Sequence, residues 1–250
     1  MKRNFFILLS ILGFTSLYAQ SVLPFEQSWQ FRQAGKWQWY KAEVPGSVHT
    51  DLLANKLIDD PFYRDNESRL QWIEKTDWEY RCVFDASPAL MTNGSLKLVF
   101  EGLDTYASIY LNGEILQRTD NMFRLWKLPV ANKLKKDKNE LKIIFSSAAN
   151  HDDSLAAIYP VKLPGENTRM FSRKAQYQYG WDWGPRFVTA GIWKPIHWEL
   201  AEPVSPLSDL HWNVQLVDSP DKDGRAFYFK KDGQPVYIKG ANWIPCESFI

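Results

Sequence analysis

The residues best suited to chemistry lie in one run, residues 173–186, which reads RKAQYQYGWDWGPR and holds four aromatic rings, one carboxylate and three cations. In an extended strand Trp181 and Trp183 would share a face and Asp182 would point away. The glycines on either side of this trio predict a bend, which could bring a ring and the carboxylate into one concavity. An aromatic face packs on the C–H side of a sugar, and a carboxylate accepts strong hydrogen bonds from vicinal hydroxyls. The alternative is that both Trp are core residues and Asp182 closes a turn, and spacing alone leaves the two open.

No other group of side chains predicts a catalytic centre. The histidines at 49, 151, 197 and 211 lie beside no nucleophile elbow, and His49 is interpreted as a capping or packing residue. The adjacent acids 59–60 and 152–153 face opposite ways in an extended chain, so we interpret them as solvated loop charges. No phosphate-binding glycine loop and no zinc-ligand spacing occur, so neither a metal nor an organic cofactor is indicated.

Composition indicates a globular protein and excludes some partners. The chain has 250 residues, 45% hydrophobic and 24% charged, and a formal net charge of +1. Such a charge offers no polybasic field for nucleic acid or an anionic membrane surface. Twelve Trp are an unusually large number. We expect most of them in the core or in contacts with other domains, among them Trp72, Trp78, Trp193 and Trp198.

The first 19 residues are predicted to be a secretory signal peptide. Lys2-Arg3 precede a short apolar run, and Ala19 offers a small residue for cleavage. The run is too short for a flanked membrane span, and the alternative is a buried N-terminal helix. No later segment reaches the length of a spanning helix, so we expect an exported protein, periplasmic or extracellular.

The elements that must position the aromatic run are strands. Period-two alternation occurs at residues 78–84, 96–100 and 141–145, and Asn112-Gly113 and Asp232-Gly233 predict two-residue hairpin turns. Residues 20–201 are therefore predicted to form an all-β, antiparallel jelly-roll sandwich.

Helix and disulfide signals are weak. The best helix is predicted at residues 50–57, capped by Thr50, with Leu52, Leu53 and Leu57 on its apolar face. Cys82 and Cys246 lie in apolar surroundings without a disulfide framework, and we interpret them as small buried hydrophobes.

Ordered motifs within residues 44–196 resemble one enzyme family. They are VPGSVHTDLL at 44–53, DPFYRDNE at 60–67, QWI at 71–73, DWEY at 77–80, GLDTYA at 102–107, LNG at 111–113, YGWDWGP at 179–185 and GIWKPI at 191–196. They are similar to the N-terminal, galactose-binding-like domain of β-mannosidases in glycoside hydrolase family 2. The resemblance implies a jelly-roll domain, an immunoglobulin-like sandwich and a TIM barrel that releases terminal β-D-mannose with retention through two glutamates. It also implies that Trp181 and Asp182 touch the terminal mannose of a β-mannoside oligosaccharide.

The rest of the chain departs from that pattern. Residues 202–224 leave room only for a remnant or linker of an immunoglobulin-like domain, which needs about 100 residues. Residues 225–250 resemble the start of a TIM barrel of about 250 residues, with KGANWIP at 239–245 as its first strand and exit. Asn242 and Trp243 at this exit, and Trp183, join Trp181 and Asp182 as expected substrate-binding residues. No catalytic residue is assigned in this chain.

Three hypotheses follow. The first is a β-mannosidase present as an internally deleted and truncated chain, inactive alone. The second is a carbohydrate-binding module without hydrolytic activity, and the third is a non-functional fragment from a gene-model error. The sequence leaves linkage preference and oligomeric state open.

Overall fold

The structure is a computed structural model that describes residues 22–161, 168–200, 214–222 and 224–237. The predicted signal peptide at 1–19 and the expected site residues Asn242 and Trp243 lie outside the described residues, as does Cys246.

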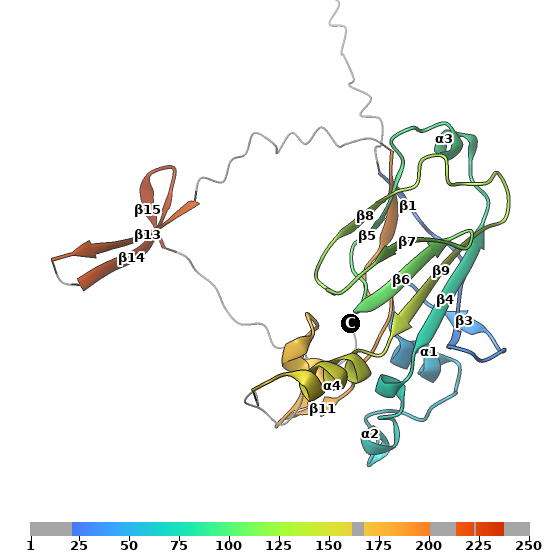
Figure 1. Cartoon of the computed structure of the whole chain (residues 1–250), viewed down its shortest axis with the longest axis horizontal. Helices are drawn as coiled ribbons and strands as arrows, with labels where there is room; N and C mark the ends of the chain where they lie inside the picture. The colour runs from blue at the N-terminus through green and yellow to red at the C-terminus, as the bar shows by residue number, and fades with distance from the viewer. Residues whose placement is uncertain (1–21, 162–167, 201–213, 223, 238–250) are drawn as a thin grey trace, which may run out of the picture.

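Two antiparallel sheets form a sandwich (Figure 1). The six-stranded sheet has the order β3 (Tyr40–Ala42), β2 (Trp29–Gln33), β4 (Trp78–Phe84), β9 (Asn139–Ser146), β6 (Tyr106–Leu111) and β7 (Glu114–Arg118). The four-stranded sheet has the order β1 (Val22–Pro24), β12 (Ile196–Glu199), β5 (Lys97–Phe100) and β8 (Trp126–Pro129). The chain crosses repeatedly between the two sheets, and the predicted all-β sandwich is confirmed.

The strands form where side chains alternate between core and surface. In β9 the buried positions are Leu141, Ile143 and Phe145, with half-exposed residues between them. In β4 the alternating residues Trp78, Tyr80 and Cys82 are also buried. In the turn between β6 and β7, Asn112 and Gly113 have φ values of 54° and 87°, so the predicted two-residue hairpin is confirmed.

Aromatic side chains join the two sheets. Phe84 of β4 meets Trp198 of β12 with ring centroids 5.9 Å apart, and Phe25 contacts both rings at 5.1 and 5.2 Å. Trp78 is also buried, whereas Trp72 is 42% exposed and is not a core residue. Of the two positions expected for Trp72, the core is therefore excluded, and a contact with another domain stays a prediction.

Cys82 lies in this core as a free thiol, and burial raises its pKa. The interpretation of Cys82 as a small buried hydrophobe is confirmed.

The first helix begins earlier than predicted. α1 spans Val48–Ala54, and its N-cap is Ser47, not Thr50. Thr50 is the third helical residue and completes a reciprocal capping box with Ser47, so both residues cap the helix. The helix also ends earlier than predicted, before Leu57. Leu52 is buried and Leu53 is exposed, so of the predicted apolar face only Leu52 is confirmed.

A longer helix was not predicted. α4 spans Ala148–Ile158, and the Ser147 side chain caps it by accepting a hydrogen bond from the Asn150 backbone. Its buried side chains include a carboxylate, so no simple apolar stripe marks it. The remaining helical pieces are short: α2 (Asn66–Arg69), α3 (Pro88–Met91), and the 3₁₀ turns η1 (Ile73–Lys75), η2 (Arg169–Phe171) and η3 (Gln176–Gln178).

The last described residues form a separate three-stranded antiparallel sheet, β13 (Val214–Asp221), β14 (Gly224–Lys231) and β15 (Gln234–Val236). The predicted turn at Asp232-Gly233 is confirmed by positive φ at both residues. Residues 218–221 are the end of β13 and pair with β14. The predicted remnant and barrel start at 202–224 and 225–250 stay predictions.

Candidate functional site

The Trp-Asp-Trp run is the tip of a tight hairpin. β10 (Tyr179–Trp181) pairs with β11 (Gly184–Arg186), and Asp182 and Trp183 are the two residues of the turn. Gly180 has φ 84°, and a Cβ there would lie 3.1 Å from the Arg186 side chain. The position requires glycine because other residues rarely adopt this backbone conformation. The bend predicted from the flanking glycines is confirmed.

The side chains at this tip face away from the core. Trp181 is 47% exposed and Trp183 66% exposed, and their ring centroids are 5.6 Å apart in an edge-to-face arrangement. The Arg169 guanidinium lies 4.8 Å from the Trp181 ring centroid, and Asp182 is exposed. The alternative that both Trp are core residues is therefore wrong. A hydrophobic surface and a carboxylate are instead presented together.

Arg186 fixes the base of this hairpin to the segment 67–74. Its guanidinium donates two hydrogen bonds of 2.9 Å to the carboxylate of Glu74, and its backbone N–H donates to Glu67 Oε1 at 2.7 Å. Its backbone carbonyl accepts from Gln71 Nε2 at 2.9 Å. A two-point Arg–carboxylate contact fixes direction as well as distance, so the hairpin leaves the sandwich at a defined angle.

Tyr179, opposite Arg186, is held by a buried carboxylate. Its hydroxyl donates to Asp152 Oδ2 at 2.5 Å, and Ser172 Oγ donates to Asp152 Oδ1 at 2.5 Å. Burial and this contact raise the pKa of the Tyr179 phenol, which stays protonated and can donate. Asp152 is completely buried, so its interpretation as a solvated loop charge is wrong. Because α4 turns residue 152 inward, only Asp153 stays exposed, where it pairs with a lysine.

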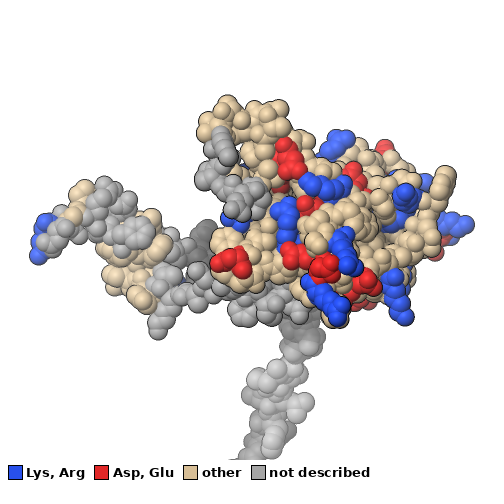
Figure 2. All heavy atoms as spheres, turned by 90° about the horizontal axis from the view of Figure 1, so that it is seen from below, with Lys and Arg blue, Asp and Glu red and all other residues tan. Residues whose placement is uncertain are grey.

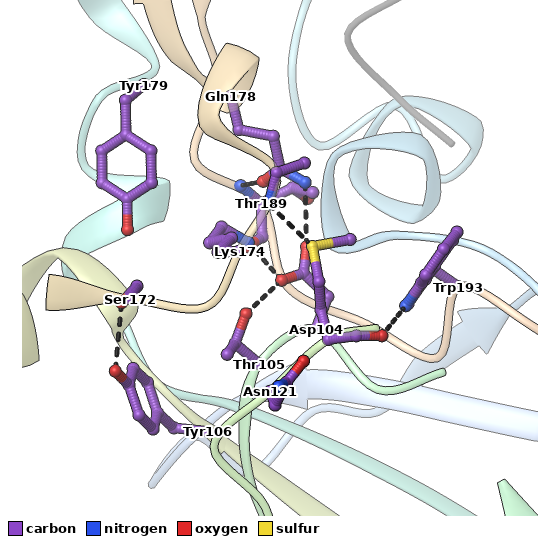
Figure 3. A network of polar contacts seen from close by, with 12 residues as sticks. Asp104, Thr105, Tyr106, Asn121, Ser172, Lys174, Gln178, Tyr179, Thr189 and Trp193 are labelled. Atoms are coloured by element: carbon purple, nitrogen blue, oxygen red, sulfur yellow. Dashed lines mark hydrogen bonds and ion pairs between the residues drawn. The ribbon is translucent and has the colours of Figure 1, made fainter. Parts of the chain in front are cut away.

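A buried charge pair, Lys174 with Asp104, belongs to the network of polar contacts in Figure 3. Lys174 Nζ, fully buried, donates to Asp104 Oδ1 at 2.5 Å and to the Thr189 carbonyl at 2.7 Å. Gln178, directly before β10, donates to Asp104 Oδ2 at 3.0 Å and accepts from the Thr189 N–H at 3.1 Å. Burial lowers the pKa of Lys174, and the charge of Asp104 acts in the opposite direction.

His49 packs against the same region. Its Nδ1 lies 2.8 Å from the Thr189 hydroxyl, and burial lowers its pKa to about 3, so the ring is neutral. Two residues further, burial raises the pKa of Asp51 to about 6, although the Tyr80 hydroxyl donates to it at 2.7 Å. His49 is a packing residue, as predicted, and is not poised as a base.

The surface around this end of the sandwich carries both signs of charge. On the face seen in Figure 2, Lys and Arg side chains are interspersed with Asp and Glu, without a large area of one sign. Within the part of the chain that the structure describes, no three His, Cys, Asp or Glu side chains come together as a metal site. No helix in that part is long and apolar enough to cross a membrane.

The position of the hairpin turn could be predicted from the sequence, but the buried polar residues that support the hairpin could not. Asp104, Asp152 and Lys174 have partners 20 to 74 residues away in the chain, and spacing cannot reveal such pairs. The only available signal was the density of polar residues around the Trp-Asp-Trp run.

An antiparallel sandwich of two sheets, with the chain crossing repeatedly between them, is the architecture of a jelly-roll domain. Residues 29–194 match the glycosyl hydrolase 2 galactose-binding domain-like family, and the chain belongs to that family.

Similar proteins share a name. The chain is 41% identical over 197 residues to "Beta-mannosidase B" of Thermothelomyces thermophilus, covering 76% of this chain and 23% of that protein. It is 38% identical over 210 residues to "Beta-mannosidase A" of Emericella nidulans, covering 80% and 22%. The solved β-D-mannosidase of Dictyoglomus thermophilum superposes with a TM-score of 0.76 at 29% identity, covering 91% of this chain and 41% of that one. The chain thus spans about a quarter of the length of these curated relatives.

Proposed function

We propose that this chain is the N-terminal part of a β-mannosidase-type glycoside hydrolase that releases terminal β-D-mannose from β-mannosides with retention. Its contribution is substrate binding by the hairpin tip, not catalysis. The observation that carries the proposal is the exposed Trp181-Asp182-Trp183 turn on a buried, charge-paired base. The names of the curated relatives support the choice of sugar.

Each residue of the tip has a role in this proposal. The face of Trp181 packs on the C–H side of the terminal sugar, with Trp183 supporting the ring edge to face. Asp182 accepts hydrogen bonds from vicinal hydroxyls, which its charge strengthens. Asn242 and Trp243 join the site from outside the described residues.

The catalytic carboxylates belong elsewhere in the proposal. Retaining hydrolysis needs two carboxyl groups about 5–5.5 Å apart on either side of the glycosidic bond. At the hairpin tip the described residues present one exposed carboxylate, Asp182, while Asp104 and Asp152 are buried in hydrogen bonds. We therefore place the two catalytic glutamates outside these 250 residues.

The first experiment assays residues 20–250 against an aryl β-mannoside. We expect no turnover, because one exposed carboxylate cannot supply both the acid and the nucleophile. If this chain hydrolyses the substrate and Asp182→Ala abolishes the activity, the proposal that Asp182 binds the sugar without catalysing hydrolysis is contradicted.

The second experiment uses the complete gene, sequenced across codons 205–225 and beyond codon 250. The encoded protein is assayed with aryl β-mannoside, β-galactoside and β-glucuronide, and we expect preference for the mannoside. Asp182→Asn should lower kcat/KM for the mannoside about 10- to 100-fold, the worth of a hydrogen bond to a charged group. Asp137→Asn is the matched control. Asp137 is an exposed carboxylate just before β9, where the start of β9 pairs with the end of β4, and α4 follows the opposite end of β9. Equal losses in both variants would contradict the assignment.

A second candidate function is sugar binding without hydrolysis, favoured by the exposure of both Trp at the tip. Calorimetry of the chain with mannobiose tests it. Heat that saturates at millimolar sugar and disappears in Asp182→Asn would support a binding module, and no heat would count against it. A non-functional fragment predicts poor recovery of folded protein, which size-exclusion chromatography would show.

We also propose export, based on the N-terminal charged and apolar run. In a bacterial host the recovered protein should begin at Gln20 by N-terminal sequencing. A chain that retains Met1 in the cytoplasm would contradict export.

A further inference from the structure

A concave site lies at the edge of the six-stranded sheet, lined by none of the residues of the hairpin tip. The turn between β2 and β3, the end of α1 and the segment around Trp72 enclose a cavity of about 410 Å³. Small-molecule sites commonly span about 300 to 1,000 Å³. The cavity is therefore large enough for a ligand of at least one ring.

The wall of this cavity is a continuous series of aromatic rings. Tyr40 and Phe31 have centroids 6.1 Å apart, Phe31 and Trp78 6.1 Å, and Trp78 and Trp72 5.9 Å. The series runs from buried rings to exposed ones, since Phe31 and Trp78 are buried and Trp72 is 42% exposed. The buried rings hold their neighbours in place, so a flat apolar ring in the cavity would meet the half-buried Tyr40 and the exposed part of Trp72.

Trp37 stands at the rim and is 94% exposed. A single exposed hydrophobic residue is ordinary on a protein surface. An exposed indole beside an aromatic-lined concavity is unusual, because Trp is among the side chains that gain most free energy from being covered. The position of Trp37 therefore indicates a ligand with an apolar face.

The other lining groups favour a polar ligand. Gln33 and Gln38 supply amides that can donate and accept, and Lys36 supplies an ammonium group. Arg32 is held in place by Glu79 at 2.7 Å. Among the described residues that line the cavity there is no carboxylate. Aromatic faces combined with amide and cationic donors match a pyranose ring, which has one C–H face and an equatorial belt of hydroxyl oxygens.

We propose that this cavity is a second carbohydrate site, which binds pyranose rings of an oligosaccharide independently of the Trp181-Asp182 tip. This second site goes beyond the proposed function, because the residues that line the cavity have no role in sugar binding at the hairpin tip. The segment from Leu70 to Lys75 lies between the sites: Gln71 donates to the Arg186 carbonyl, and the next residue, Trp72, lines the cavity. The hairpin base and the cavity therefore contact adjacent residues of one short segment, each through a different side chain.

The experiment is ¹⁹F NMR of the whole chain labelled with 5-fluorotryptophan, in which each of the twelve Trp gives its own resonance. Trp37→Phe, Trp72→Phe, Trp181→Phe and Trp183→Phe assign the four signals that matter. β-1,4-Mannotriose, cellotriose and trigalacturonic acid are added separately to 50 mM. We expect the Trp37 and Trp72 signals to shift together and saturably with at least one of these sugars.

Two alanine variants make the test specific. Trp37→Ala should weaken the response at Trp72 about tenfold without loss of folding, since the ring is almost fully exposed. Trp183→Ala is the matched control, another exposed Trp, and should leave the cavity response unchanged. Unshifted Trp37 and Trp72 signals with all three sugars would overturn the proposal, as would equal affinity in wild type and Trp37→Ala. A response confined to Trp181 and Trp183 would overturn it too while supporting the proposed function, so the two can fail separately.

Discussion

Replacement of Lys174 by Met should reveal how much the buried charge pair contributes to the domain. The substitution keeps a long unbranched side chain but leaves the Asp104 carboxylate buried without its cation. Asp104 keeps the hydrogen bond from Gln178 at 3.0 Å and the one from the Thr105 hydroxyl, and the Thr189 carbonyl loses a donor. Removal of one partner of a buried pair costs about 3–5 kcal/mol, a large part of the roughly 5–15 kcal/mol that stabilises a domain.

The assay is equilibrium unfolding in urea, followed by Trp fluorescence. Lys174→Met should shift the midpoint strongly without changing the slope, because the folded state stays equally compact. Lys133→Met is the control, since its pair with Glu114 at 3.1 Å is largely exposed and is worth about 0–1 kcal/mol. Asp104→Asn combined with Lys174→Met removes both charges, and should recover about 2 kcal/mol relative to the sum of the single changes.

Two results would refute this reasoning. A loss no greater than that of Lys133→Met would mean that water reaches Asp104 or that its other hydrogen bonds suffice. Additive losses in the double variant would mean that the two side chains do not stabilise each other. Either result would remove the buried pair as the support behind Gln178 and the hairpin.

Two further changes test neighbouring contacts. Asp152→Ala leaves the Tyr179 hydroxyl buried without its acceptor, so the unfolding free energy should fall by about 1–3 kcal/mol and hydrogen exchange of the hairpin amides should accelerate; unchanged exchange would contradict the anchoring role. Because burial lowers the pKa of His49 to about 3, the unfolded chain binds a proton between pH 4 and 6.5 that the native state does not. The stability of wild type relative to His49→Gln should therefore rise with pH, by up to about 1.4 kcal/mol per unit, whereas Asp51, with its pKa raised to about 6, gives the opposite slope in both proteins. Urea unfolding between pH 4 and 7 measures the difference, and a constant difference would show that His49 protonates freely in the folded state.

The strands could be predicted because their signals are local. Alternation in β9 and the positive φ required at Asn112-Gly113 depend on adjacent residues alone. The Trp-Asp-Trp tip was found for the same reason, since its glycines and aromatic residues are contiguous.

The support of the tip could not be predicted in this way. A buried carboxylate such as Asp152 resembles a solvated one until α4 places it next to Ser172 and Tyr179. The cavity beside Trp37 was missed because its walls come from a turn, a helix end and a loop more than 30 residues further on. Long-range polar pairs and concave surfaces are properties of the assembled fold.

The anchoring of the hairpin also determines when it can form. Arg186 bonds to Glu74 and Glu67 across 112 and 119 residues of chain, so both are long-range contacts. Such contacts form only after the loss of chain entropy has been offset by nearer pairings. The tip should therefore become ordered late, once both sheets have closed. An ordered Trp181-Asp182 tip then reports that residues 67–186 have folded, and a ribosome-bound chain ending before residue 186 would have no binding surface to display.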